Sequence, residues 1–245
     1  MTGKNELCIG DILSAAAYWD IDLQEEQASL LLDYYQFLKQ ENSKYNLTSI
    51  IDPEAVLEEH FIDSLAGLSK GRRMTGDELL DLGSGAGFPG VPIKILQPTL
   101  KLFLLEASGK KIHFLTMLLK KLQLHDVTLL QFRAEDLGKG EGREKYSWVT
   151  ARAVAPLAIL IEIAMPLVKI GGYFWAFKGP NFNKELAEAE EILTYCGGTL
   201  VEIIDYMLPR SRKNRSILIF KKVTATNERF PRKAGIPQKR PLIKK

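Results

Sequence analysis

The sequence predicts an α/β fold: a seven-stranded, mostly parallel sheet with helices on both faces, preceded by an N-terminal helical cap. From Glu78 onward, short apolar runs alternate with amphipathic stretches, as in parallel strands joined by helical crossovers. Before Glu78 the apolar residues instead recur at helical spacing. Near the end of the chain, two apolar runs are separated by only a short polar turn, which favours an antiparallel hairpin at an edge of the sheet.

The elements are expected in the following order. The cap comprises two helical segments, 23–39 and 53–68, joined by a polar connector at 45–50, and Asp52 before Pro53 is a favourable N-cap. Strands are expected at 79–82, 102–105, 127–132, 147–151, 173–177, 199–207 and 216–223, and helices at 91–96, 110–122, 157–168 and 184–195. We therefore divide the chain into a cap at 1–72, a sheet domain at 73–223 and a basic tail at 224–245.

Composition excludes several classes of protein. The 245 residues are 46% hydrophobic and 26% charged, which is typical of a soluble globular protein. The longest apolar stretch, 154–170, is interrupted by two prolines and a glutamate and is too short to span a bilayer. No signal peptide is visible. Two isolated cysteines and three scattered histidines favour a reducing cytoplasm and give no metal-ligand spacing, so we expect a cytoplasmic protein without a metal site.

The net charge of +3 conceals a strong asymmetry. Residues 209–245 hold thirteen Lys and Arg against one acid, a net charge of +12, whereas residues 1–208 carry a net charge of −9. Such a distribution favours a polyanionic partner, such as nucleic acid, that is bound at one place. The alternative is a solvated basic tail that serves solubility.

The most informative motif is a glycine-rich turn that follows the apolar run ending at Asp81-Leu82. It comprises Gly83, Ser84, Gly85 and Gly87, followed by Phe88. Bare backbone here lets a ligand lie against the turn and the amides of the next helix. The spacing G-x-G-x-G lacks the third interval of the dinucleotide fingerprint, which favours S-adenosylmethionine over a nicotinamide cofactor. By itself, such a loop can also be an ordinary tight turn.

Acidic residues follow the next two strands. Glu106 lies nineteen residues after Gly87 and can accept both hydroxyls of a ribose, or it can simply face the start of the helix near Ser108. After the third strand, Ala134 and Glu135 can supply backbone and carboxylate to an adenine, although a solvated acidic turn explains them equally well. Three successive strand ends of this kind predict one adenosyl pocket.

Two basic residues end the next strands. Arg152 follows the fourth strand and is expected to point into the cleft where substrate meets the methyl group, and Lys178 follows the fifth. The alternatives are an ion pair with an acid near the sheet end for Arg152, and an ordinary lysine at a strand exit, rather than a phosphate contact, for Lys178. The chain lacks the Asn/Asp-Pro-Pro-aromatic run of exocyclic-amine methylases and the Pro-Cys pair of pyrimidine C5 methylases. A target with a free lone pair, such as guanine N7, requires no general base, and we expect none here.

The chain resembles the small-subunit ribosomal RNA methyltransferase G family, also called glucose-inhibited division protein B. The resemblance covers nearly the whole length and rests on residues 45–48, 60–65, 81–89, 133–136, 150–153 and 230–237. The glycine turn fits any Rossmann-like class I methyltransferase, whereas the His-Phe-Ile-Asp-Ser-Leu segment at 60–65 and the tail motif are more specific.

The resemblance implies methylation of guanine N7 in the 530 loop of 16S ribosomal RNA, with S-adenosylmethionine as donor and S-adenosylhomocysteine as product. It implies the small ribosomal subunit or its precursor as partner. It also implies that the cofactor site is lined by Gly83, Phe88, Ala134, Glu135 and Arg152. Arg152 then lies at the methionine end or between both ligands. The roles of Asn46, Thr48, His60 and Asp63 stay open.

Two basic segments are expected to bind phosphates. They are the hairpin turn with Arg210, Arg212, Lys213 and Arg215, and the tail with Arg229, Arg232 and Lys233. Two alternatives remain: a small-molecule methyltransferase on the same fold, and a non-catalytic RNA-binding or ribosome-assembly protein.

Overall fold

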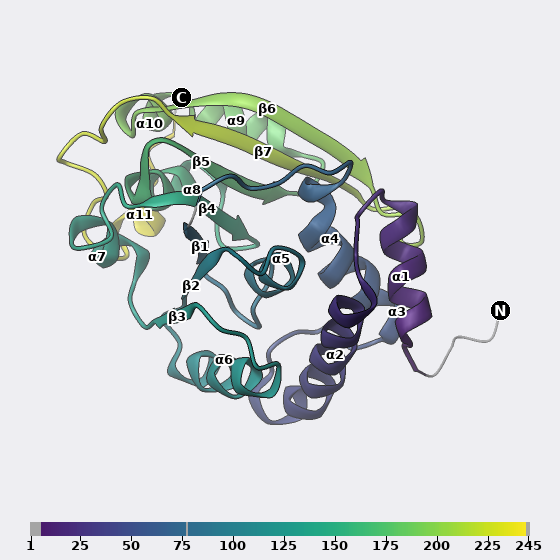
Figure 1. Cartoon of the computed structure of the whole chain (residues 1–245). Coiled ribbons are helices and arrows are strands. Elements are labelled where there is room, and N and C mark those ends of the chain that lie inside the picture. Colours follow the sequence, from purple (N-terminus) through teal and green to yellow (C-terminus); the bar gives the residue numbers. More distant parts are fainter. Residues whose placement is uncertain (1–5, 77, 244–245) are drawn as a thin grey trace.

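A computed structural model describes residues 6–76 and 78–243, and within them one seven-stranded sheet forms the centre of the molecule (Figure 1). The strands are β1 (Glu78–Leu82), β2 (Lys101–Leu105), β3 (Val127–Leu130), β4 (Tyr146–Arg152), β5 (Val168–Lys178), β6 (Gly198–Met207) and β7 (Asn214–Lys222). Their order is β3-β2-β1-β4-β5-β7-β6, and only β7 runs antiparallel to its neighbours. The predicted fold class and the hairpin at the edge are confirmed.

The helices of the described residues precede, connect and follow these strands. They are α1 (Ile9–Tyr18), α2 (Glu25–Tyr45), α3 (Pro53–Val56), α4 (Asp63–Leu65), α5 (Gly90–Leu96), α6 (Gly109–Lys121), α7 (Ala134–Lys139), α8 (Leu157–Ala164), α9 (Phe182–Glu188), α10 (Glu190–Tyr195) and α11 (Ile236–Lys239). A π-helical turn, Leu57–Ile62, joins α3 to α4, and 3₁₀ turns follow α4 and α8. Asp52 caps α3 as expected, since its Oδ1 accepts the Ala55 amide at 3.0 Å.

Some helices differ from the sequence expectation. The single helix expected at 184–195 is two helices, α9 and α10, that meet at Ala189. Sequence patterning missed α1, α7 and α11. The last two have six and four residues, too few for a helical period to stand out, and α1 buries only Ile12 and Ala16.

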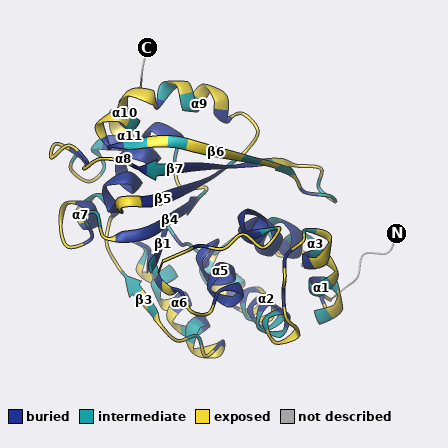
Figure 2. Cartoon of the chain, turned by 45° about the horizontal axis from the view of Figure 1, so that its top comes forward, coloured by how far each residue is buried: buried dark blue, intermediate teal, exposed yellow. Residues whose placement is uncertain are grey.

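Two helical layers cover the sheet. One face carries α5 and α6 with the cap helix α2 packed on them, and the other carries α7, α8 and α10 (Figure 1). Figure 2 shows β1 and β4 buried in the middle, while the edge strand β6 is largely exposed. The cap shares the core of the sheet. Tyr34 of α2 is fully buried, stacks on Phe88 with ring centroids 5.0 Å apart, and donates its hydroxyl proton to the Ala86 carbonyl.

The basic tail is docked on the face that carries α7 and α8. Arg143 donates to the carbonyls of Thr226 and Phe230 at 2.7 and 2.8 Å. Arg232 forms a two-pronged ion pair with Glu162, whose side chain is buried. These contacts bring residues from the end of the chain to the carboxyl ends of β1, β2 and β3.

No helix in the described residues is long and apolar enough to cross a membrane. The same residues contain no group of three or more His, Cys, Asp or Glu side chains able to hold a metal ion.

Candidate functional site

Two cavities lie at the carboxyl ends of the parallel strands, where ligands bind in open α/β sheets. The first, which we call the glycine-side cavity, has a volume of about 310 Å³. The second, the cap-side cavity, has a volume of about 350 Å³ and lies between the strand ends and the cap. Ala153 and Ala155, just after β4, line both cavities. The two spaces therefore meet beside the end of β4.

The glycine turn borders the glycine-side cavity through Gly83. Gly83 has φ +71°, and a Cβ added there would lie 2.7 Å from Cγ2 of Val154, which lines the same cavity. Gly85 has φ +60°, and an added Cβ would meet only the Gly83 carbonyl oxygen, at 3.8 Å. These backbone conformations favour glycine, and they leave the surface of the turn bare. The turn thus provides the close approach that the motif predicts.

The amides of the turn, in contrast, are occupied by protein acceptors. Those of Gly83 and Ser84 donate to the Leu105 carbonyl at 2.8 and 3.1 Å. The Gly90 amide, at the start of α5, donates to Asp81 at 3.1 Å. Burial raises the pKa of the Asp81 carboxyl to about 6. At these positions a ligand therefore meets the shape of the turn rather than free donors, and the expected contact between ligand and turn stays a prediction.

Glu106 supports the turn from the neighbouring strand. Its Oε2 accepts the Gly85 amide at 3.1 Å, and its Oε1 accepts the Ser108 amide at 2.8 Å. Lys111 lies 3.8 Å from the same carboxylate. The side chain is nearly buried yet lines the glycine-side cavity. Glu106 therefore fixes two backbone segments while presenting its carboxylate to the cavity.

The third strand end brings Ala134 and Glu135 to the same cavity, at the start of α7. Glu135 Oε1 accepts the Gly235 amide of the tail at 2.9 Å, so the tail closes the outer wall with Pro237 and Gln238. Phe132, whose side chain is 48% exposed, also lines the space. Sequence reasoning missed these wall residues. An aromatic residue beside Arg133 was a usable signal for Phe132, whereas the tail is about 100 residues away along the chain.

Arg152 connects the cap to the strand ends. Its Nη1 donates to the Glu59 carbonyl and to Asp63 Oδ2, both at 2.9 Å, and its Nη2 lies 3.3 Å from His60 Nδ1. The guanidinium also lies over the Phe88 ring, 5.2 Å from the centroid. Arg152 lines the cap-side cavity, whereas Gly83, Glu106 and Glu135 line the other. Arg152 therefore lies next to Ala153, which lines both cavities.

The neighbours of Arg152 explain residues that the sequence left open. A guanidinium only donates, so His60 Nδ1 accepts and Nε2–H donates to Thr48 Oγ1 at 3.0 Å. Burial and the Arg152 charge lower the His60 pKa to about 3, and the ring is neutral. Asp63 accepts from Arg152 and from the Tyr206 hydroxyl, at 2.7 Å. Asn46 ends α2 in the left-handed conformation.

Lys178 and Glu185 form the far wall of the cap-side cavity. Lys178 Nζ lies 2.6 Å from Glu185 Oε2 and 3.4 Å from the Ala155 carbonyl. Glu185 Oε2 also accepts the Leu157 amide, at 2.7 Å, at the start of α8. Both side chains line the cavity, Lys178 from the end of β5 and Glu185 from α9. The sequence predicted Lys178 as a site residue but not Glu185. The only sequence evidence for Glu185 was that an acid occurs in the helix that follows Lys178.

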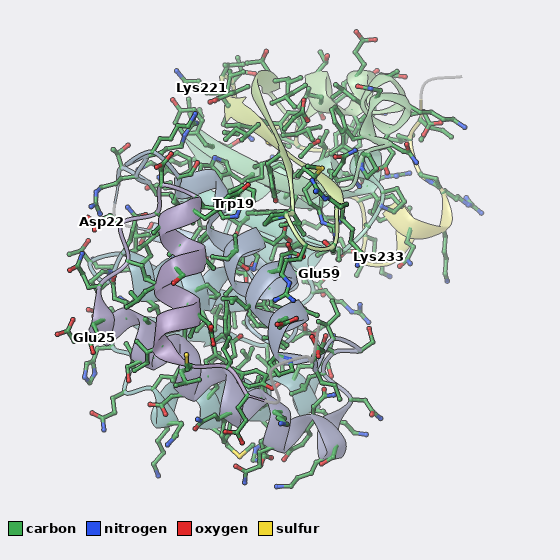
Figure 3. All side chains as sticks on the ribbon, turned by 90° about the vertical axis from the view of Figure 1, so that its right-hand side faces the viewer. Trp19, Asp22, Glu25, Glu59, Lys221 and Lys233 are labelled. Carbon is green, nitrogen blue, oxygen red and sulfur yellow. The ribbon has the colours of Figure 1, made fainter. Side chains whose placement is uncertain are left out.

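Acids of the cap already pair with most of the basic hairpin turn. Arg210 pairs with Glu54, and Lys213 lies 2.6 Å from Glu59. Figure 3 labels Glu59 of the cap and Lys233 of the tail. Arg215 lies 3.5 Å from Glu59, with Asp63 at 3.8 Å. Ion pairs with described residues were found neither for Arg212 at the tip nor for Arg229 and Lys233 in the tail, and all three are exposed.

Comparisons with known proteins agree with this geometry. Residues 27–225 match the model of a family described as rRNA small subunit methyltransferase G. A Desulforamulus reducens protein named Ribosomal RNA small subunit methyltransferase G is 42% identical and covers 97% of this chain and 99% of its own. A Lactobacillus acidophilus protein of the same name is 40% identical, with coverage of 91% and 94%. Among solved structures, YcgJ of Bacillus subtilis superimposes with a TM-score of 0.50 at 11% identity, over 67% of this chain and 100% of its own, which shows a shared fold.

Proposed function

The chain belongs to the rRNA small subunit methyltransferase G family of S-adenosylmethionine-dependent enzymes, and on that premise we propose that it methylates guanine N7 in the 530 loop of 16S rRNA. The proposed partner is the small ribosomal subunit or its precursor, and the proposed location is the cytoplasm. One observation carries the proposal beyond the family name. Two cavities, one lined by a glycine turn and acids and the other by cations and acids, meet at Ala153 and Ala155.

The glycine-side cavity fits the cofactor. We propose that Glu106 accepts the ribose hydroxyls and that Ala134 and Glu135 border the adenine, with Phe132 against its face. Gly83 lines this cavity, and a Cβ there would collide with Val154. We propose that Ser84, Gly85 and Gly87 hold the turn in this shape from behind Gly83. S-adenosylmethionine supplies a methyl group on a positively charged sulfur, ready for attack by a lone pair.

The cap-side cavity fits the target nucleotide. We propose that Arg152 lies between both ligands and that Lys178 positions the base. His60 is unsuited to act as a base, because both of its ring nitrogens are engaged and its pKa is about 3. Guanine N7 attacks without losing a proton, so positioning by this cavity is the chemistry that the protein must add.

We propose two groups of basic residues as RNA contacts, and the groups differ in whether an acid of the protein already pairs with them. Arg212, Arg229 and Lys233 are exposed and available to phosphates. Arg210, Lys213 and Arg215 reach phosphates only by exchanging a carboxylate partner of the cap, and Arg232 by leaving Glu162.

The test is methyl transfer from labelled S-adenosylmethionine to small-subunit RNA that lacks the modification, followed by mapping of the labelled base. We expect label at N7 of one guanine in the 530 loop. Naked RNA, precursor particles and mature subunits are compared in parallel to identify the substrate. Label on an exocyclic amine or a ribose, or no transfer to any of the three, would overturn the proposal.

A further inference from the structure

Three groups follow one another along the wall of the cap-side cavity. Ala155 lies at the junction with the glycine-side cavity, Lys178 Nζ lies 3.4 Å from its carbonyl oxygen, and Glu185 lies 2.6 Å from Lys178. From Ala155 at the junction, a chain of contacts therefore leads to a hydrogen-bond donor, Lys178, and then to an acceptor, Glu185.

One carboxylate oxygen of Glu185 is available to accept a hydrogen bond from a ligand. The hydrogen bond from the Leu157 amide and the ion pair with Lys178 both involve Oε2. The other carboxylates of this cavity are engaged on both oxygens or by several donors. Glu59 holds Lys213 with both oxygens, and Asp63 accepts from Arg152 and Tyr206. Glu185 Oε1 is therefore the acceptor that a ligand can use.

The edge of guanine carries the complementary groups in the same order. N7 and O6 are adjacent acceptors, and N1–H, a donor, comes next to O6. With N7 at the junction, O6 faces Lys178 and N1–H faces Glu185. Adenine carries an amino donor in place of O6 and an acceptor nitrogen in place of N1–H. It would therefore place its amino group against the donor Lys178 and its ring nitrogen against the carboxylate of Glu185.

We propose that Lys178 and Glu185 form a guanine-recognition pair, in which Lys178 donates to O6 and Glu185 Oε1 accepts N1–H of the target base. This inference rests on the proposed function and assigns the base specificity within it. The pair is held before the ligand arrives, because Glu185 Oε2 is fixed by the Leu157 amide and Lys178 by Ala155. Such fixed groups discriminate strongly, since a wrong base places a donor against Lys178 and an acceptor against Glu185.

The test uses Glu185→Gln in the full-length protein. The amide oxygen of the substituted side chain can keep the contacts of Oε2 with Leu157 and Lys178, which turns the NH₂ group toward the base as a second donor. We expect kcat/KM for small-subunit RNA to fall on the order of 100-fold, with S-adenosylmethionine affinity and melting temperature unchanged. Glu188→Gln is the matched control, because Glu188 lies in the same helix and pairs with the exposed Lys184 at 3.8 Å.

A modified RNA separates recognition from a structural role. Wild-type protein should prefer guanine strongly over 1-methylguanine at the target position, since the latter lacks N1–H. Glu185→Gln should lose most of that preference. If Glu185→Gln matches Glu188→Gln in rate and keeps the preference, the recognition pair is overturned while the proposed function stands. If wild-type protein does not methylate guanine N7 at all, the proposed function fails, and the pair with it.

Discussion

The two cavities that meet at Ala153 and Ala155 are built in opposite ways. The glycine-side cavity is made by short segments that follow β1, β2, β3 and β4, together with α8 and the tail, and its carboxylate Glu106 is fixed by backbone amides. The cap-side cavity is made by charged side chains from the cap, β4, β5, α9 and β7, which pair with one another. In the glycine-side cavity, backbone contacts hold Glu106 in one position. In the cap-side cavity, the charged side chains form ion pairs with one another. We expect a phosphate or base to bind there by adding to those ion pairs or replacing them.

The largest effect is expected from Arg152→Ala, which acts on both cavities. Removing the guanidinium separates the cap from the strand ends and leaves Asp63, nearly buried, without its main cation. We expect kcat/KM for methyl transfer to fall at least about 100-fold, because a displacement of about 1 Å can cost this much. Arg152→Lys keeps the charge but not the planar fork and should restore little of the loss. Steady-state kinetics of both variants measure this, and a loss below about 3-fold in Arg152→Ala would show that the junction does not depend on this residue.

Glu106→Ala should affect the glycine-side cavity alone. The variant loses the acceptor that we assign to the ribose and the contacts that hold Gly85 and Ser108. We expect S-adenosylmethionine affinity to fall about 10- to 100-fold, as for loss of charged hydrogen bonds. Isothermal titration measures this affinity, and RNA binding without cofactor is the internal control. A matching loss of RNA affinity would contradict the division between the two cavities.

His60 should make folding depend on pH below neutrality. Its pKa is about 3 in the folded protein and about 6.5 when unfolded, so acid protonates the unfolded chain first and stability falls as pH falls. The contribution is complete above pH 6.5 and decreases by about 2 kcal/mol between pH 8 and pH 5. Denaturant unfolding of wild type and His60→Gln measures it as a difference that changes only below pH 7. A difference that is flat from pH 8 to pH 5 would show that His60 is solvated.

The smallest effect is expected at the hairpin tip. Arg212 is exposed, whereas Arg210 is paired with Glu54. Arg212→Ala should lower affinity a few-fold for RNA of any sequence and reduce the slope of log affinity against log salt by about one unit. Arg210→Ala should change the slope less, because breaking its pair with Glu54 already offsets part of each phosphate contact. Salt titrations of the two variants compare them directly, and equal slopes would show that the cap acids do not restrain the hairpin.

The sequence predicted more of the residues of the glycine-side cavity than of the cap-side cavity. The glycine turn, Glu106 and Ala134-Glu135 could all be found because each follows a strand, and parallel strands align their carboxyl ends at one edge of the sheet. The sequence held only weak evidence for Glu185 as a site residue, and no evidence that the amides of the turn have protein acceptors. Both features depend on which distant backbone groups lie within hydrogen-bond distance. The basic turn was visible as charge, but its pairing with Glu54 and Glu59 was not, since these acids lie more than 150 residues away.

The sequence by itself determined the strand and helix alternation, the glycine turn with its acids, and the family, because these are encoded in local periodicity and spacing. Only the tertiary structure decided how Arg152, His60 and Asp63 meet, why Lys178 lies beside Glu185, and that the tail closes the glycine-side cavity. The physical reason is that charged side chains select partners by distance and burial after the chain has folded, and neither quantity is present in a linear pattern.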